Sequence, residues 1–541
     1  MTPFARLLEA LVYAPGRNQK LRLMTGYFRA APDPDRGWAL AALAGALELP
    51  TFTGGVFRAL AEERVDPVLF RLSHDFVGDL AETVALIWPG GAEDGRAPPL
   101  SEVVATLRAT ARAERMAVLA ALLDRMGPSE RFALVKLCAG GLRVGVSQRL
   151  AKTALAEMGA KPVERIEELW AGLSPPYADL FRWLEGGPEP AVDLSLAFRP
   201  MMLAHPVESF LYSAAEQREN RESEAETRAR LQAKLAPGDF LAEWKWDGVR
   251  VQAVATAEGR ALYSRTGEDF GAAFPDVLEA MRWRGCVDGE LLVARDGEAA
   301  PFSELQRRLN RKRPSARDLA ERPALVRAYD LLHDGREDLR PLPLGERRAR
   351  LERWIAETRP ERLDLSPLVS FADWGALTRL RAGARGAAQE GLMLKRRDAP
   401  YQGGRPMGLW FKWKRDPLTA DCVLMYAQRG HGKRSSFYSD YTFGCWRDDG
   451  ELTPVGKAYS GFTDAELTEL DRFVRTHTTD RFGPVRAVEP LLVLEVAFDA
   501  VQRSTRHKSG VAMRFPRIRR IRWDKPPEEA DRLETLERWA M

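Results

Sequence analysis

The segment EWKWDGVR at residues 243–250 combines side chains suited to nucleophilic chemistry. Its lysine, Lys245, stands among two carboxylates, two tryptophans and an arginine. A lysine amine attacks an electrophile only when it is unprotonated, so an active site must desolvate the amine or set other cations nearby. Taken alone the pattern is weak, because solvated lysine and aspartate in a β-turn are commonplace. The hypothesis that Lys245 is a nucleophile therefore depends on the rest of the chain.

Six further segments follow in order, and most of them place charged residues at the edge of a strand. They are YSRTGEDF (263–270), VDGELLV (287–293), AYDLL (328–332), EGLMLK (390–395), WFKWK (410–414) and RFPRI (514–518). Apolar and charged residues alternate over 241–251 and again over 287–293, which predicts strands whose polar side chains share one face. Glu243, Lys245 and Asp247 are therefore predicted to lie on one strand face.

The segment WFKWK predicts two ammonium groups, those of Lys412 and Lys414, on one side of a strand. Such a pair is unfavourable unless an anion lies nearby. A phosphoryl group fits, because nucleotidyl transfer relies on positioning and on neutralisation of charge by lysine, arginine and metal. Considered alone, the two lysines could equally protect an edge strand from aggregation.

Two carboxylates, Glu290 and Glu390, could supply hard oxygen ligands to a magnesium ion that keeps much of its water. Each single signal has a structural alternative. Tyr329 could be an ordinary core aromatic, and Arg265 with Glu268 could be a surface ion pair. The joint order of the six segments favours chemistry over these alternatives.

Length, charge and cysteine content agree with an intracellular nucleic-acid enzyme of several domains. A chain of 541 residues suggests three or four domains, and 45% hydrophobic residues suffice for several cores. The net charge is only +4, so a nucleic-acid surface must come from local clustering. The four cysteines lie far apart, without the spacing of a zinc site or a disulfide framework. No segment resembles a secretory signal or a membrane span, which predicts a cytoplasmic protein with no membrane partner.

Three regions can be distinguished along the chain. Residues 1–200 show apolar spacing of three and four, which predicts an all-helical region. The segment KLCAGGLRVGVS (136–147) interrupts this pattern, either as a tight turn between helices or as a loop whose backbone amides hold a DNA phosphate. From about residue 418 the short strands with aromatic and glycine punctuation suit a small barrel, and its final stretch is strongly basic.

The ordered segments resemble the nucleotidyltransferase motifs of the superfamily that forms a covalent lysine adenylate, and their spelling is similar to that of ATP-dependent DNA ligases. The resemblance covers nearly the whole chain. It implies a multidomain fold, with an all-α DNA-binding domain at 1–200, an α+β nucleotidyltransferase (adenylation) domain at 201–417 and an OB-fold β-barrel domain at 418–541. The segment GLRVGVS matches the glycine-rich turn of the helical domain in larger ligases, which implies that Gly140, Gly141 and Arg143 contact the DNA backbone.

The resemblance also implies a role for each site residue. Lys245 would attack the α-phosphate of ATP and carry the adenylate. Glu243 would read the adenine amino group and Tyr329 would stack on the base. The remaining roles are ribose contact by Arg250 and Glu290, phosphate contact by Arg265, Arg405, Lys412 and Lys414, orientation of pyrophosphate by Arg514 and Arg517, and metal binding by Glu290 and Glu390. Of these residues, Arg405 departs most from the expected spacing.

The cofactors implied are ATP and magnesium, with manganese as a substitute, and the substrate implied is nicked double-stranded DNA. The segment VGDLAET (77–83) resembles bacterial ligases associated with repair helicases, which implies a monomer with helicase or nuclease partners. Alternatives are an RNA ligase, a GTP-using capping-type nucleotidyltransferase and a catalytically silent DNA-binding scaffold. An NAD-dependent ligase is excluded, since the sequence has no four-cysteine zinc module.

Overall fold

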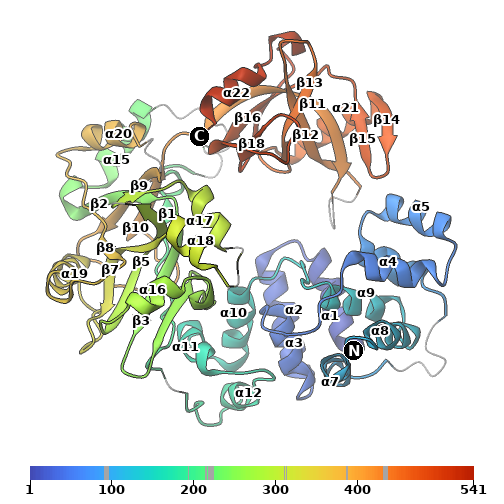
Figure 1. Ribbon diagram of the computed structural model, residues 1–541, viewed down its shortest axis with the longest axis horizontal. Coiled ribbons are helices and arrows are strands. Elements are labelled where there is room, and N and C mark those ends of the chain that lie inside the picture. The colour runs from blue at the N-terminus through green and yellow to red at the C-terminus, as the bar shows by residue number, and fades with distance from the viewer. Residues whose placement is uncertain are drawn as a thin grey trace. The chain divides into compact units, whose positions relative to one another are not determined.

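The computed structural model forms two compact units. One comprises Met1–Met158, Pro175–Phe181 and Pro417–Met541, and the other comprises Gly159–Ser174 and Arg182–Asp416. Figure 1 colours the chain from its helical N-terminal part in blue to its C-terminal strands in red. No helix in the described part of the chain is long and apolar enough to cross a membrane. The structure describes residues 1–90, 97–192, 194–213, 216, 224–295, 297–309, 311, 313–384, 388–430 and 436–540.

The N-terminal part is helical, and the residues described before His205 contain no β-strand. Each helix buries one apolar face, as spacing of three and four requires. In the first helix that face consists of Phe4, Leu7, Leu8 and Leu11. The helices are α1 (Thr2–Tyr13), α2 (Arg17–Ala30), α3 (Asp35–Leu43), α4 (Gly54–Glu62), α5 (Pro67–Val77), α6 (Leu80–Ile87), α7 (Leu100–Ala109), α8 (Arg115–Asp124), α9 (Pro128–Cys138), α10 (Gln148–Gly159), α11 (Val163–Leu169) and α12 (Ala178–Leu184).

The glycine-rich segment forms the turn between α9 and α10. Gly140 and Gly145 have φ angles of 81° and 66°, which glycine adopts without strain. Arg143 also has a positive φ, 49°. Lys20 of α2 donates hydrogen bonds to the carbonyl oxygens of Val144 and Gly145, at 2.7 and 3.1 Å. Two carbonyl groups of the turn are therefore hydrogen-bonded to a side chain of α2.

The middle part is built on two antiparallel sheets that also contain two parallel pairings. The first has the order β1-β10-β9-β2 and the second the order β4-β3-β5-β7-β8, with β6 paired to β5. Its strands are β1 (His205–Pro206), β2 (Phe240–Trp246), β3 (Val249–Ala255), β4 (Arg260–Ser264), β5 (Gly285–Arg295), β6 (Glu298–Ala299), β7 (Ala324–His333), β8 (Leu363–Leu365), β9 (Gln389–Arg396) and β10 (Trp410–Lys414). Its helices are α13 (Val207–Leu211), α15 (Glu224–Lys234), α16 (Pro275–Ala280), α17 (Phe302–Leu309), α18 (Ala316–Glu321), α19 (Leu344–Thr358) and α20 (Trp374–Ala382).

The prediction that Glu243, Lys245 and Asp247 share one strand is wrong. The alternating stretch is interrupted, because Asp247 and Gly248 form a bend between β2 and β3. The two strands belong to different sheets. The alternation of residue types continues across the bend, which is why the sequence suggested a single strand. The consequence is that Lys245 lies at the end of one sheet, where the chain passes to the other.

The segment that precedes β1 belongs to the core of the middle part. Phe198, Met201 and Met202 are buried with Tyr401 and Trp410 in one apolar cluster. Strands β3, β5 and β7 contribute to a second cluster under helices α16 and α19. A third cluster, built on residues of β2, β9 and β10, forms the core of the first sheet. Both sheets therefore pack on close-packed apolar side chains.

The C-terminal part is a branched antiparallel sheet. The long strand β11 pairs with β12 along one edge, and on the other edge with β16 through its first half and with β15 through its second half. The described ladder pairings leave this sheet open and not closed into a ring. The elements are β11 (Leu418–Arg429), β12 (Tyr438–Trp446), β13 (Leu452–Ala458), α21 (Asp464–Thr476), β14 (Thr478–Phe482), β15 (Val485–Val488), β16 (Val493–Phe498), β17 (Ala500–Arg503), β18 (Val511–Arg514), β19 (Arg517–Arg522) and α22 (Leu533–Trp539).

Candidate active site

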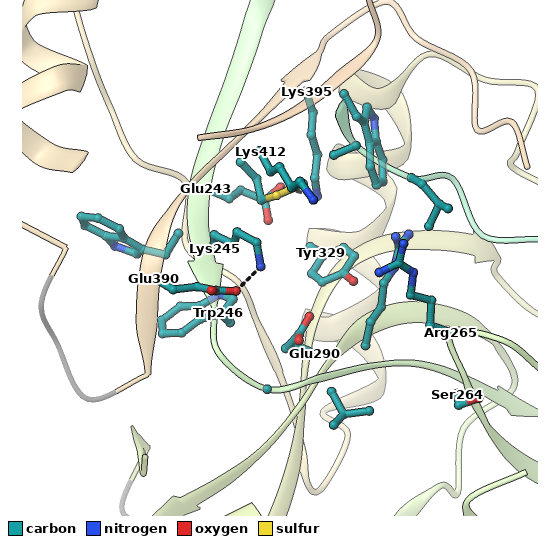
Figure 2. A pocket seen from close by; sticks show the side chains of 18 of the residues that line it. Glu243, Lys245, Trp246, Ser264, Arg265, Glu290, Tyr329, Glu390, Lys395 and Lys412 are labelled. Atoms are coloured by element: carbon teal, nitrogen blue, oxygen red, sulfur yellow. Dashed lines mark hydrogen bonds and ion pairs between the residues drawn. The ribbon is translucent and has the colours of Figure 1, made fainter. Parts of the chain in front are cut away.

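A cavity of about 430 Å³ lies where the two sheets of the middle part meet. Figure 2 shows side chains from both sheets pointing into it. Among the predicted site residues, the cavity wall contains Glu243, Lys245, Arg250, Arg265, Glu290, Tyr329, Glu390 and Lys412. Segments far apart in the sequence therefore meet in one cavity.

Lys245 reaches the cavity because the chain bends sharply just after it. Gly248 is required at this bend, since a Cβ there would come within 2.5 Å of the carbonyl oxygen of Leu291 on β5. A backbone hydrogen bond also stabilises the bend, because the amide of Asp247 donates to the carbonyl oxygen of Ala388 at 2.7 Å. Asp247 itself is not among the described residues that line the cavity.

Glu390 lies between two ammonium groups. Lys245 Nζ donates a hydrogen bond to Glu390 Oε1, and Lys414 Nζ lies 2.8 Å from Glu390 Oε2. Figure 2 marks the first contact with a dashed line. Burial acts to raise the pKa of Glu390, but the two ammonium groups outweigh it and lower that pKa below its ordinary value. The side chain of Lys414 is 44% exposed and stands beside the cavity, not in its described wall.

A second glycine brings these groups together. Gly391 follows Glu390 with a φ of 141°, and a Cβ there would clash with the carbonyl oxygen of Trp413 on β10. Only glycine allows β9 and β10 to approach so closely at this point. The Glu-Gly pair of the segment EGLMLK thus places its carboxylate against the lysines of WFKWK.

Lys412 and Arg265 face the cavity without a carboxylate partner among the described residues. Burial lowers the pKa of Lys412, and the neighbouring cations Lys245 and Arg405 lower it further. Burial likewise lowers the pKa of Arg265, with Arg250 and Arg405 adding to the effect. Arg405 is exposed and is not part of the described cavity wall, although it acts on both side chains through its charge. This end of the cavity is therefore suited to an anion.

Glu290 is the carboxyl group whose protonation is most altered. Burial raises its pKa to about 7, in spite of the opposing effect of Lys245 and Arg250. The nearby carboxylates Glu390 and Asp288 add to the rise. A carboxyl group in this state exchanges its proton readily near neutral pH, and a cation bound beside it would favour the ionised form.

Arg250 is held by protein groups on several sides. Its guanidinium forms two hydrogen bonds to the buried Asp288, at 3.0 and 2.6 Å, and one to the carbonyl oxygen of Met202 at 2.6 Å. It also donates to the Tyr401 hydroxyl at 3.3 Å, which in turn donates to Asp288 at 2.6 Å. The sequence reasoning missed Asp288 and Tyr401. Asp288 stands two residues before Glu290 in the segment VDGELLV, and this spacing on a strand was the available signal.

The remaining wall is aromatic and contains one buried lysine. Tyr329 is only 8% exposed and lines the cavity, which combines the core position and the cavity position that its sequence context left open. Lys395 donates a hydrogen bond to Glu243 at 3.1 Å and lies over the ring of Tyr329. Sequence reasoning assigned no role to Lys395, although a lysine at the end of the apolar run LML was a signal.

Other predicted residues belong to the compact unit that comprises Met1–Met158, Pro175–Phe181 and Pro417–Met541, and not to the unit that contains the cavity. Gly140, Gly141 and Arg143 lie in the turn after α9, Arg514 ends β18 and Arg517 begins β19. Arg517 donates to Asp499 at 3.2 Å. Between these two strands, Phe515 has a φ of 51° and is 64% exposed. None of these residues is among the described residues that line the cavity.

Comparison with known proteins gives a consistent result. Residues 222–414 match the family model of the ATP dependent DNA ligase domain, and residues 434–525 match that of the ATP dependent DNA ligase C terminal region. A protein of Koribacter versatilis (strain Ellin345) named "Probable DNA ligase" is 32% identical, with 99% of this chain and 96% of that protein covered. A protein of the same name from Anaeromyxobacter dehalogenans (strain 2CP-C) is 34% identical, with 99% and 98% covered.

One solved structure shares the fold over nearly the full length. It is named "Pmar-Lig_PreS3" and superimposes with a TM-score of 0.59. The match covers 96% of this chain and 99% of that chain, at 16% sequence identity. At this identity the likeness concerns the fold alone.

The unbalanced charge of the cavity leads to a first prediction. We expect Lys412→Ala to weaken the binding of inorganic tripolyphosphate by about ten-fold or more, because a buried ammonium group forms strong hydrogen bonds to phosphate oxygens. Isothermal titration calorimetry of the full chain would measure this. Lys234→Ala is the matched control. It removes an exposed lysine of α15 that donates only to backbone carbonyl groups of α13 in the described contacts, and the variant should bind tripolyphosphate as the parent protein does. Equal affinity of both variants would contradict the prediction.

Proposed function

The chain belongs to the family of ATP-dependent DNA ligases, and from this premise we propose how its residues divide the work of sealing a nick. The enzyme uses ATP, and the comparisons do not favour the RNA ligase, the GTP-using transferase or the silent scaffold. The observation that supports the proposed division best is the position of Lys245, whose amine enters a cavity that holds more cations than carboxylates.

We propose that Lys245 Nζ attacks the α-phosphorus of ATP. A nitrogen–phosphorus bond forms, the bond to the bridging oxygen breaks, and pyrophosphate leaves. The amine must first lose the proton that it shares with Glu390, and a phosphate placed among Lys412, Arg265 and Lys414 would stabilise the charge that develops. The adenylate then passes to the 5′-phosphate of the nick, and the 3′-hydroxyl displaces AMP.

We further propose that Glu290 and Glu390 hold a magnesium ion beside the phosphates. Both are cavity carboxyl groups with hard oxygen donors, and the pair fits an ion that retains several waters. When bound, the ion would supply positive charge close to the transferred phosphoryl group. Glu390 could then exchange its contact with Lys245 for the metal, which would free the amine.

The base and ribose are assigned to the opposite end of the cavity. Glu243 accepts a hydrogen bond from the adenine amino group, Tyr329 stacks on the ring, and Arg250 with Glu290 faces the ribose. Support for this end comes from its small exposed area and its aromatic wall. Arg405, Arg514 and Arg517 are proposed to act on the phosphates and on pyrophosphate.

DNA binding is assigned to the two ends of the chain. We propose that residues 1–200 act as a DNA-binding domain, that residues 418–541, whose described strands form an open sheet and not a closed barrel, act as an OB-fold domain that grips the duplex, and that the nucleotidyltransferase domain covers residues 201–417. The turn with Gly140, Gly141 and Arg143 would contact phosphates. Its carbonyl groups are bonded to Lys20, which leaves its amide side for a ligand.

The nucleophile assignment can be tested directly. Lys245→Ala should form no covalent adenylate with ATP and magnesium, because no other amine occupies its position. Intact-mass spectrometry would detect the added AMP in the parent protein. The variant should still seal a nick whose 5′-phosphate is already adenylated, since that step does not need the amine, and this serves as the control for folding. An AMP adduct on the variant would refute the assignment.

The metal assignment predicts a dependence on pH. The pKa of Glu290 is raised to about 7, so its carboxyl group is protonated below that pH and ionised above it. Protons therefore compete with the metal as pH falls, and the free magnesium concentration for half-maximal adenylation should rise by up to about ten-fold per pH unit below 7. Single-turnover adenylation at pH 6, 7 and 8 would measure it. A magnesium requirement that stays constant over this range would contradict the assignment.

The DNA assignment predicts an effect on salt dependence. Arg143→Ala should weaken binding to a nicked duplex equally for different sequences, and should reduce the slope of log affinity against log salt by about one. Fluorescence anisotropy at several salt concentrations would measure the slope. Arg353→Ala, on the exposed side of α19, is the control and should leave the slope unchanged. An unchanged slope for Arg143→Ala would show that residues 136–147 form only a turn between helices and do not contact DNA phosphates through Arg143.

A further inference from the structure

Lys395 and Glu243 form an almost fully buried ion pair in the cavity wall. Each side chain is only 2% exposed, and Lys395 Nζ donates to Glu243 Oε1 at 3.1 Å. The same ammonium group lies 4.2 Å from the ring centroid of Tyr329 and 4.5 Å from that of Trp410. Figure 2 shows Lys395, Glu243 and Tyr329 converging at one end of the cavity. Carboxylate and aromatic rings together therefore surround the charge of Lys395.

Burial of an ion pair carries a large desolvation free energy, and apolar residues of similar size would often stabilise the fold equally well. The surroundings of the pair are largely apolar, since the ammonium group lies over the rings of Tyr329 and Trp410, and Met393 precedes Lys395 on the same face of β9. A charged pair in such surroundings calls for a reason beyond packing. The reason lies in what the lysine does to Glu243.

Glu243 has one carboxylate oxygen bonded to Lys395 and lines the cavity. Lys395 is its hydrogen-bonding partner within the described part of the chain. The hydrogen bond from the ammonium group fixes the orientation of this carboxylate, and a carboxylate can only accept hydrogen bonds. The oxygen that Lys395 does not engage is therefore available to accept from a ligand.

We propose that Lys395 is a positioning residue that sets the selectivity of the enzyme for a 6-amino purine over a 6-oxo purine. It does so by holding Glu243 as a fixed anion. An adenine amino group donates to this anion, whereas the 6-oxo group of hypoxanthine or guanine would place an acceptor against an acceptor. The inference rests on the proposed role of Glu243 in reading the base.

Loss of the ammonium group would change the selectivity in a defined direction. Without it, Glu243 loses the hydrogen bond that fixes the orientation of its carboxylate. A carboxylate that is free to turn no longer holds an acceptor against a 6-oxo group, and the amide of a glutamine at this position can donate to that group. Lys395→Met and Glu243→Gln should therefore act in the same direction. A purely structural role of the pair would instead reduce the use of both nucleotides in equal proportion.

The experiment compares ATP with ITP, which differ at the 6-position and in the N1 proton. For the full chain, the rate of covalent nucleotidylation is measured at several concentrations of each nucleotide. We expect Lys395→Met to raise KM for ATP more than it lowers kcat, and to reduce the ATP-to-ITP ratio of kcat/KM by at least about ten-fold. Lys395→Arg should recover part of the ratio because it restores the positive charge.

A double-mutant cycle identifies the route of the effect. Because both single changes remove the same fixed acceptor, Glu243→Gln combined with Lys395→Met should change the ratio little beyond either single variant. Arg308→Met is the matched control. It breaks another buried ion pair of the same unit, with Asp276 at 2.7 Å, and should lower thermal stability without changing the ratio. Sealing of a pre-adenylated nick reports whether each variant is folded.

The outcomes separate the inference from the proposed base site. If Glu243→Gln alters the ratio but Lys395→Met lowers kcat/KM for ATP and for ITP by the same factor, the inference is wrong. The assignment of Glu243 to the base is then still supported. If neither variant alters the ratio although both seal a pre-adenylated nick, the assignment of Glu243 to the base is wrong as well. A reduced ratio in both variants, partly recovered by Lys395→Arg, supports the inference.

Discussion

The active site depends on a concentration of positive charge that the protein only partly neutralises. Glu390 serves two ammonium groups at once, those of Lys245 and Lys414. Lys412 and Arg265 face the same cavity without a carboxylate partner among the described residues. Like charges held close together in a poorly solvated site repel one another, so this arrangement favours any anion that can enter. A nucleoside triphosphate would relieve the repulsion, and the same charges would draw its phosphates to the position at which Lys245 is proposed to attack.

This charge is concentrated by backbone geometry as much as by residue type. Two glycines, Gly248 and Gly391, remove side chains at the points where neighbouring strands come closest. A Cβ at either position would push β2 away from β5 or β9 away from β10, and would separate Lys245 from Glu390. The close-packed apolar clusters on which the two sheets rest resist such a shift of the strands. The positions of the reacting side chains therefore depend on close backbone contacts at two glycines, which carry no side chain themselves.

Sequence motifs were informative about which residues meet and less so about how they pair. Ordered segments identified residues that the structure gathers in one cavity, because their spacing reflects positions at strand ends. The bend at Asp247 was missed, since alternation of residue types is the same in one strand as in two strands joined by a bend. The partners of Arg250 and Glu243 were missed for another reason. Asp288, Tyr401 and Lys395 are distant in sequence, and only tertiary packing brings them into contact.

The two ends of the cavity differ in how completely they are paired, and this difference suits their tasks. At the proposed base and ribose end, Glu243 and Arg250 are already bonded to protein groups and are held in fixed orientations. A preformed array of acceptors and donors loses little entropy on binding and rejects a base of the wrong pattern. At the proposed phosphate end, Lys245 and Lys414 share the single carboxylate of Glu390, and Lys412 and Arg265 have no carboxylate partner among the described residues. Positive charge is therefore left over to stabilise the negative charge that develops on the phosphates during the proposed transfer. Selectivity and catalysis can therefore be altered by substitutions at opposite ends of the same cavity.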